Sequence, residues 1–307
     1  MGVRIRSVFA IVLLGWTAGP YAAAAPVAAR MRNVVLHMGY GVELHIDDLR
    51  GHFDSSDPAG PSFDDINSYV VALDYARVAM TPASLTNLMN QYVFVGDDAP
   101  IKKVAISIEG DELVQSGELK KGVSVPFKMH ASVSLAPDGR LRLHPTSMKA
   151  AGFVSKRVLD FFGLELEKLV KMKGDHGVTA EGDDLLLEPG RMLPPPHMRG
   201  RATKTWIENG RLMLQFGNPA AKGIEPPKPV ANYMYYRGGT LRFGKLTMRD
   251  ADLLLVDADP RDPFDFSPAK YEDQLIAGTS KNTRVHGLIV TMPDANDAAK
   301  GEARTSR

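Results

Sequence analysis

The chain has 307 residues, of which 44% are hydrophobic and 24% charged, a composition typical of a folded protein with a core of its own. The formal net charge is +1, so the chain lacks the basic excess typical of nucleic-acid-binding proteins, and we expect no nucleic-acid partner. The absence of cysteine excludes disulfides, thiolate metal ligands, a cysteine nucleophile and an acylated N-terminal cysteine.

Residues 1–25 predict a signal peptide. Two arginines precede an apolar run over residues 8–16, and the small residues that follow offer Ala-x-Ala cleavage frames, so we expect cleavage between Ala22 and Ala25. The alternative is an uncleaved anchor, but the run is shorter than the ~20 residues that span a bilayer. The sequence therefore predicts an exported protein of a bacterial periplasm.

The first segment of the mature chain predicts strands. Residues 42–53 carry apolar side chains on even positions up to Ile46 and on odd positions from Leu49, which predicts a bulge near Asp47 and Asp48. Residues 69–75 alternate in the same way and predict a second strand.

A helix is expected next. Thr81 is a suitable N-cap, Pro82 suits the first helical position, and apolar residues then recur at helical spacing as far as Val93. No charged residue occurs between Pro82 and Gly96, which indicates that the helix is covered on more than one side.

Two hairpins follow the helix. Residues 123–135 are apolar at every odd position, and a turn leads into further alternation from Leu141, which predicts one hairpin. Pro126 cannot donate to a neighbouring strand and indicates an edge strand or a bulge. Residues 104–108 and 113–119 predict the other hairpin, so four consecutive antiparallel strands are expected.

The rest of the chain predicts a second amphipathic helix over residues 155–171, then more strands and a short helix between Ser267 and Gly278. The later strands are expected at residues 185–187, 211–216, 240–248, 253–257 and 284–292. We divide the chain into the signal peptide, a main α+β domain, a Pro-rich connector, a C-terminal strand-rich segment packed on the main sheet and a disordered tail, at residues 1–25, 26–217, 218–230, 231–293 and 294–307.

The element order from Ser84 to Phe216 resembles the LmeA-like phospholipid-binding family of exported bacterial proteins, within the tubular lipid-binding (TULIP) superfamily. The matching stretches are the first helix, the alternating strand that begins at residue 124, the turn and strand at 138–143, and the second helix with the segment 177–188. The resemblance implies an α+β fold in which a large, curved antiparallel sheet wraps around two main amphipathic helices. A groove for acyl chains would lie between them.

On this basis we expect a lipid or another long apolar molecule as ligand, with peripheral contact to a membrane compatible with that role. Flexible methionines beside the first helix and the hairpins suit such a surface, although methionine also fills irregular cores. The expected groove residues are Leu85, Leu88, Met89, Tyr92, Val125, Phe127, Met129, Val158, Phe162 and Leu166. The alternative is a non-enzymatic envelope scaffold with a filled core.

We expect no enzyme activity and no cofactor, because the common nucleophile, phosphate-binding and dinucleotide-binding motifs are absent from the sequence. Two weak metal patterns occur, and both are more typical of solvated polar residues than of ligands, so no metal is expected. They are His45, Asp47, His52 and Asp54, and the aspartates at 257, 259, 262 and 265.

Overall fold

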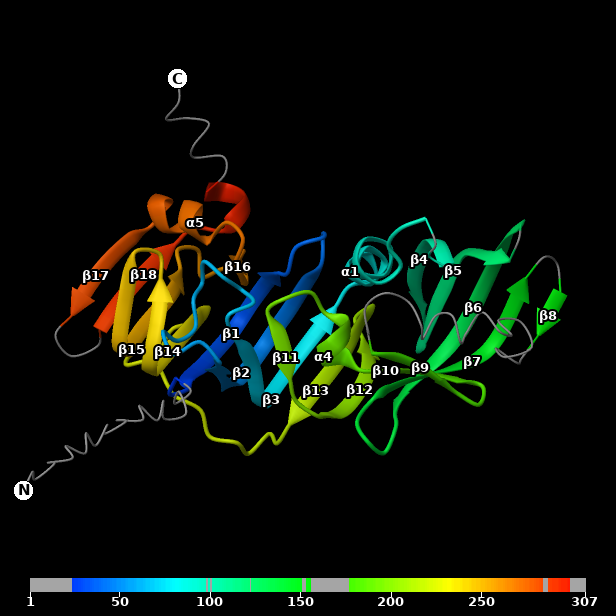
Figure 1. Ribbon diagram of the computed structural model, residues 1–307, viewed down its shortest axis with the longest axis horizontal. Helices are drawn as coiled ribbons and strands as arrows, with labels where there is room; N and C mark the ends of the chain where they lie inside the picture. Colours follow the sequence, from blue (N-terminus) through cyan, green and yellow to red (C-terminus); the bar gives the residue numbers. More distant parts are fainter. Residues whose placement is uncertain are drawn as a thin grey trace, which may run out of the picture.

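The computed structural model describes residues 24–97, 99, 101–121, 123–150, 153–155, 177–283 and 287–298. Strands account for 57% of these residues and helices for 11%. The strands form two sheets that lie end to end along an elongated molecule (Figure 1).

The larger sheet takes strands from both ends of the chain. Its main path runs β12-β13-β3-β2-β1-β14-β15-β18-β17, with β11 added beside β3 and β16 beside β1. The strands are β1 (Val27–His37), β2 (Glu43–Asp54), β3 (Val70–Met80), β11 (His197–Arg199), β12 (Ala202–Glu208), β13 (Arg211–Gly217), β14 (Tyr233–Phe243), β15 (Leu246–Asp257), β16 (Phe264–Phe266), β17 (Thr279–Thr283) and β18 (Gly287–Met292).

The smaller sheet comes from the middle of the chain and follows the order β4-β5-β6-β7-β10-β9, with β8 beside β7. Its strands are β4 (Ile101–Glu109), β5 (Glu112–Lys121), β6 (Val123–Leu135), β7 (Leu141–Ala150), β8 (Phe153–Ser155), β9 (Val178–Glu181) and β10 (Asp184–Leu187). The four consecutive antiparallel strands expected from the two hairpins are therefore confirmed. Pro126 does not mark an edge, because β6 lies between β5 and β7.

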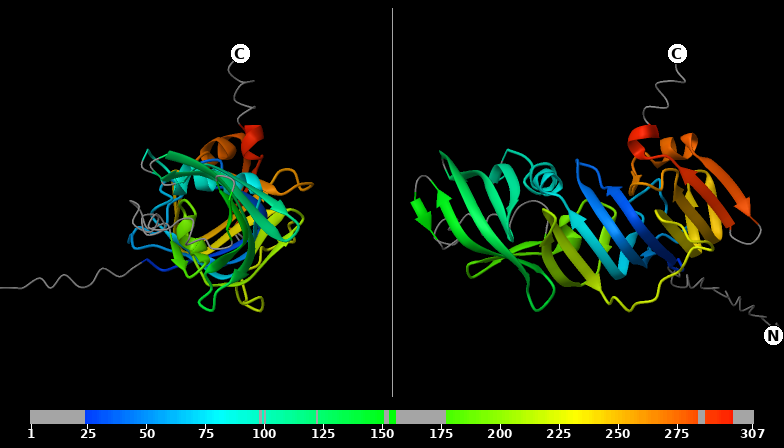
Figure 2. Two further views of the ribbon diagram at one scale, coloured as in Figure 1. Left: turned by 90° about the vertical axis from the view of Figure 1, so that its right-hand side faces the viewer. Right: turned by 180° about the vertical axis from the view of Figure 1, so that it is seen from behind.

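Both sheets curve around a common interior, as the view along the long axis shows (Figure 2). The larger sheet bends where the buried side chains of a strand change between odd-numbered and even-numbered positions. In β1 this change occurs at Asn33, which has a φ of 50°, and in β2 it occurs at Asp47. The predicted bulge in β2 is confirmed, because its pairing with β3 shifts between Ile46 and Asp48. A second shift lies between Arg50 and Gly51, and irregular pairing of this kind increases local bending.

The helices in the described part of the chain are short. They are α1 (Pro82–Leu88), the π-helix η1 (Met89–Val93), α4 (Pro189–Met192) and α5 (Tyr271–Ala277). The first begins as predicted, with Thr81 accepting a hydrogen bond from the Ser84 amide. The predicted short helix after Ser267 is confirmed as α5. Among the described residues, no helix combines the length and hydrophobicity that crossing a membrane requires.

The polar side of α1 and η1 covers the free edge of β4. The Asn90 side chain donates to the Val104 carbonyl at 2.6 Å and accepts from the Val104 amide at 2.9 Å, while Thr86 accepts from the Ile106 amide. The helix lacks charged residues because its polar side is also covered, here by β4, as the sequence predicts. These bonds also satisfy backbone groups that an edge strand would otherwise expose.

The predicted α+β fold with two main helices is wrong. The described part of the chain is mostly β, and its sheets wrap around side chains of their own strands. Only the first of the two expected helices lies in the described residues, and its buried face, from Leu85 to Val93, covers the junction between the sheets. The helix predicted at 155–171 falls almost wholly outside the described residues. Curved strands with one apolar face can enclose a hydrophobic core without long helices. The alternating strands of this chain therefore account for most of the core by themselves.

Two further strand predictions need correction. Residues 240–248 form the end of β14, a turn at Gly244 and the start of β15, because a positive φ at Gly244 reverses the chain. The C-terminal segment does not form a separate layer, since β14 pairs directly with β1. The expected tail begins with a helical turn whose Ala298 is buried, and residues after 298 lie outside the described part.

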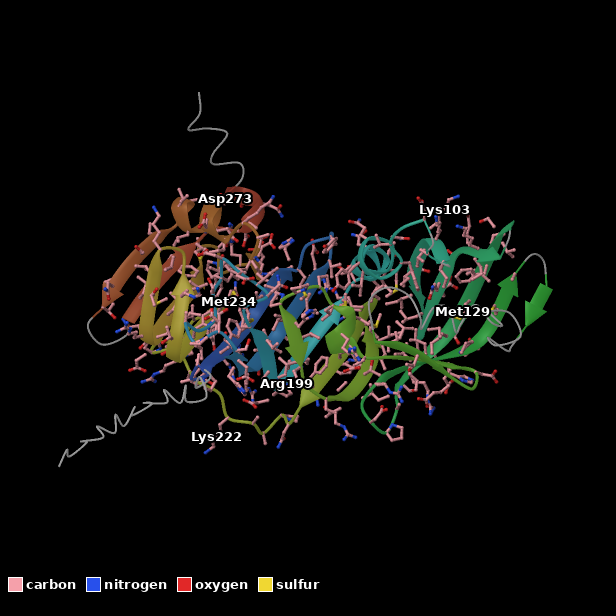
Figure 3. The ribbon with its side chains drawn as sticks, viewed as in Figure 1. Lys103, Met129, Arg199, Lys222, Met234 and Asp273 are labelled. Atoms are coloured by element: carbon pink, nitrogen blue, oxygen red, sulfur yellow. The ribbon has the colours of Figure 1, made fainter. Side chains whose placement is uncertain are left out.

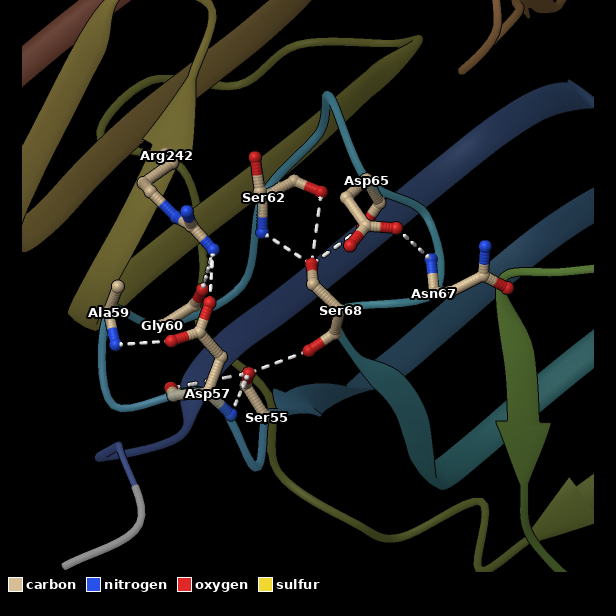
Figure 4. Close-up of polar contacts among 9 residues, drawn as sticks. All are labelled: Ser55, Asp57, Ala59, Gly60, Ser62, Asp65, Asn67, Ser68 and Arg242. Atoms are coloured by element: carbon tan, nitrogen blue, oxygen red, sulfur yellow. Dashed lines mark hydrogen bonds and ion pairs between the residues drawn. The ribbon is translucent and has the colours of Figure 1, made fainter. Parts of the chain in front are cut away.

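Aromatic side chains fill the interior of the larger sheet. Phe63, which comes from the loop between β2 and β3, packs edge-on against Tyr236 and Phe243 with ring centroids 5.4 and 5.1 Å apart. Figure 4 shows the polar contacts that hold this loop: Ser68 bonds to Ser62 and Asp65, and Arg242 of β14 pairs with Asp57 at 2.7 Å. This half of the molecule is therefore a packed core.

The Pro-rich connector lies on the outer face of the larger sheet. Arg50 of β2 donates to the carbonyls of Pro219 and Ala221 at 2.8 and 2.7 Å. Further along the connector, Ile224 and Val230 pack on the cluster formed by Tyr233, Tyr235 and Leu254. The connector is thus fixed to the sheet, and the two tyrosines are buried by this packing.

Candidate functional site

An apolar cavity of about 110 Å³ lies where the two sheets meet. Its walls come from α1 and η1, from strands of both sheets and from α4. Gln115 of β5 is the one polar side chain among the described residues that line it, and no hydrogen bond is found for that side chain there. Such a cavity favours an apolar ligand and offers one amide group to a polar atom of that ligand.

Methionines are unusually frequent in the cavity wall. They come from five different elements or the segments beside them: Met80, Met89, Met129, Met192 and Met198. A cavity of about 150 Å³ holds a benzene-sized molecule, so a whole acyl chain needs more room than the observed volume. Unbranched thioether side chains can change rotamer at low cost, which would let the wall move outward around a longer chain.

The predicted groove residues have different positions. Leu85, Leu88, Met89 and Met129 line the cavity. Phe127 is buried on the same face of β6 as Met129 but lies beyond the cavity, and Val125 is only partly buried. Tyr92 lines a neighbouring polar cleft. Val158, Phe162 and Leu166 lie outside the described residues.

Much of the cavity wall was not predicted from the sequence. Leu212, Leu214 and Phe216 of β13 line it, as do residues of β10 and α4. The alternation of β13 was visible in the sequence, but nothing local indicated that this strand faces the smaller sheet.

An open cleft of about 960 Å³ adjoins the cavity, and Pro189 and Met198 line both. Its other walls include four arginines, at positions 140, 191, 199 and 201. Figure 3 labels Arg199 at the end of β11 and Met129 in the smaller sheet. Three of the arginines occur within eleven positions around a Pro-rich segment, and that clustering is the signal that could have identified the cleft from the sequence.

The two weak metal patterns are engaged in other contacts. Asp47 pairs with Arg77 at 2.8 Å, and Asp54 pairs with Arg199. At the C-terminal pattern, Asp259 pairs with Arg261 and Asp265 with His37. Within the described ranges, no three His, Asp or Glu side chains are grouped so that they could hold a metal ion.

Two titratable groups near β16, Asp294 and His37, have raised pKa values. Burial raises the pKa of Asp294 to about 6, and the neighbouring charges of Asp257, Asp265 and Asp262 add to the increase. The hydrogen bond from His37 to Asp265 raises the pKa of His37 above its ordinary value. Both groups therefore bind protons more tightly in the folded chain than in the unfolded chain.

We expect the contributions of Asp294 and His37 to the free energy of unfolding to fall as pH rises from about 4 to above 7. Asp294 contributes between its unfolded value near 4 and its folded value near 6, and His37 contributes above 6.5, because a raised pKa stabilises the protonated folded state. Asp294→Asn should remove about 1–2 kcal/mol of this dependence, allowing for partial exposure. Urea titrations of wild type and variant at several pH values test this, and parallel pH curves would contradict it.

Comparison with known proteins gives no relative: no family model, no curated protein and no solved structure matches this chain.

Proposed function

We propose that this protein binds a lipid or another long apolar molecule in the cavity between its two sheets. The observation that carries the proposal is a wall that is apolar apart from Gln115 and rich in methionine, beside an open cleft. The larger sheet, by contrast, fills its interior with aromatic rings. Among the described residues, the apolar cavity thus lies where chain segments from both sheets meet.

The proposal includes export to the periplasm, removal of the signal peptide and a role in moving phospholipid within the cell envelope. Cleavage between Ala22 and Ala25 would leave β1 whole, because that strand begins at Val27. Membership of the tubular lipid-binding superfamily, based on the element order from Ser84 to Phe216, is part of the same proposal.

A second candidate function is that of an envelope scaffold with a filled interior. The volume of the cavity favours it, because about 110 Å³ is less than a complete acyl chain occupies. The two functions differ in whether the cavity opens around a ligand.

Filling the cavity should separate the two candidates. Ala131 of β6 lines the cavity, and Ala131→Leu places three more carbon atoms there. We expect this variant to lose uptake of a fluorescent phospholipid while its free energy of unfolding changes by less than about 1 kcal/mol, because the added atoms enter empty space. Uptake is measured by fluorescence and stability by urea unfolding.

The matched control is Ala76→Leu, at a fully buried alanine of β3 that does not line the cavity. Adding carbon atoms to a packed core typically costs about 1–3 kcal/mol, and the folded fraction should keep its uptake. Equal destabilisation by both substitutions would support the scaffold, and undiminished uptake by a folded Ala131→Leu variant would reject the cavity as the binding site. Native mass spectrometry of the purified protein would show any lipid that copurifies.

A further inference from the structure

The polar cleft beside the cavity is formed by short segments from both sheets and from two helices. These are the turn between β6 and β7, β11 with the two residues that follow it, α4 with the residue before it, and Tyr92 of η1. Pro189 and Met198 separate the cleft from the cavity, since both residues line both spaces. A molecule that extends from one space into the other would pass these two side chains.

The cleft carries a positive charge. Four arginines line it against the two carboxylates Asp138 and Glu188, which gives a net charge of +2 with histidine neutral. Arg140 is occupied by bonds to Asp138, Glu181 and Thr179 at 2.6, 2.7 and 2.8 Å. The cation best placed for a ligand is Arg199, whose side chain is 65% exposed and whose contact to Asp54 uses a single terminal nitrogen. An arginine has five N–H donors, so Arg199 retains donors for an anion.

Arg201 is held in place across the junction of the sheets. One of its terminal nitrogens donates to the Pro137 carbonyl in the turn of the smaller sheet. Gly139 in that turn has a φ of 92°, and a β-carbon there would lie 2.7 Å from Arg201 Cγ. Glycine is therefore needed both for the turn and for the close approach of the arginine stem.

We propose that this cleft binds the anionic headgroup, a phosphate or a carboxylate, of an amphiphile whose apolar chain occupies the cavity. The inference rests on the proposed function and adds the chemical class of the ligand. Guanidinium groups form strong charge-assisted hydrogen bonds with phosphate and carboxylate oxygens. Arg199 and Arg201 thereby select an anionic amphiphile over a neutral one with the same chain.

The other explanation for the arginines is that they only hold the sheets together. Arg201 has such a role through the Pro137 carbonyl, whereas Arg199 contacts Asp54, a residue of the same larger sheet as β11. Arg199 is thus the residue that distinguishes ligand selection from a purely structural role.

The test compares two ligands that share an acyl chain, lysophosphatidate and monoacylglycerol, by displacement of a neutral fluorescent probe from the full mature protein. We expect the wild type to bind lysophosphatidate about tenfold more tightly. Arg199→Gln should remove most of this preference without weakening monoacylglycerol binding, and Arg199→Lys should retain part of it. Arg201→Gln is a second variant, with its melting temperature measured because it also loses the contact to Pro137.

The matched control is Arg249→Gln, which removes an exposed arginine of β15 away from the cleft and should change neither affinity. If neither ligand binds the wild type, the proposed function itself fails. If both bind with equal affinity, or if Arg249→Gln acts like Arg199→Gln, the arginine cleft does not select the headgroup. Inorganic phosphate alone at millimolar concentration should not displace the probe, and displacement by it would identify a site for free anions instead.

Discussion

Asp48→Ala should lower the free energy of unfolding by about 3 kcal/mol. Asp48 lies between two arginines of the larger sheet: its carboxylate is 3.3 Å from Arg30, whose side chain is only 6% exposed, and accepts from Arg50 at 2.6 Å. Glu225, a second ion-pair partner of Arg30, is 66% exposed, and Tyr233, which is hydrogen-bonded to Arg30, carries no charge. Removal of Asp48 therefore leaves the buried guanidinium with one exposed carboxylate partner and beside a second positive charge, and breaking a buried ion pair in this way is strongly destabilising.

The neighbouring residue provides the control. Asp47 pairs with Arg77 at 2.8 Å, but both side chains are well exposed, at 37% and 50%. Asp47→Ala should therefore cost no more than about 1 kcal/mol. Urea unfolding of the two variants gives the comparison. Equal losses would show that burial of Arg30 does not determine the strength of this ion pair.

Phe63→Ala should lower the free energy of unfolding by about 3–5 kcal/mol, the usual cost of deleting a buried aromatic ring. The Phe63 side chain is 3% exposed and contacts rings from β2, β14, β16 and α5. These contacting rings are held by paired strands and by α5, so the loss of the Phe63 ring leaves a space that they cannot close. The loop between β2 and β3 also loses its anchor in the core.

Two other substitutions calibrate this result. Phe63→Leu keeps most of the volume and should lose clearly less stability than Phe63→Ala. Ile276→Ala, on a side chain of α5 that is 77% exposed, should change the free energy of unfolding by less than about 0.5 kcal/mol. A small loss for Phe63→Ala, similar to that of Ile276→Ala, would contradict the packed aromatic core.

Elements with a regular pattern and a neighbouring partner could be predicted from the sequence. The alternation over residues 123–135 reproduces the bounds of β6, and the hairpins around it pair as expected. By contrast, β1 was missed, although it lies in the middle of the larger sheet. The buried side chains of β1 lie mainly at odd-numbered positions before Asn33 and at even-numbered positions after it, so the strand has no continuous alternation. Its first half also buries a charged residue, Arg30, so hydrophobicity does not mark β1 as a central strand either.

The candidate site could be predicted only in part, for a related reason. Leu85, Leu88, Met89 and Met129 belong to elements whose own periodicity shows an apolar face. The opposite wall depends on which strand faces which across the two sheets, and local periodicity carries no such information. The α+β fold with two main helices was expected from the resemblance in element order, and element order does not determine whether a curved sheet encloses helices or the side chains of its own strands.

In the sequence, the strands of the smaller sheet lie between two groups of strands that together form the larger sheet. This arrangement affects the order in which the two sheets can form. Strands β4 to β7 are joined by short turns, so this part can pair soon after synthesis. The larger sheet must wait, because β1 pairs with β14 and Asn33 bonds to Asn232, 199 positions further along the chain. Until β14 has emerged, one edge of β1 lacks its final partner, and unpaired strand edges favour aggregation. Closure between β1 and β14 is thus a late step, and this edge of β1 stays without its final partner until it occurs.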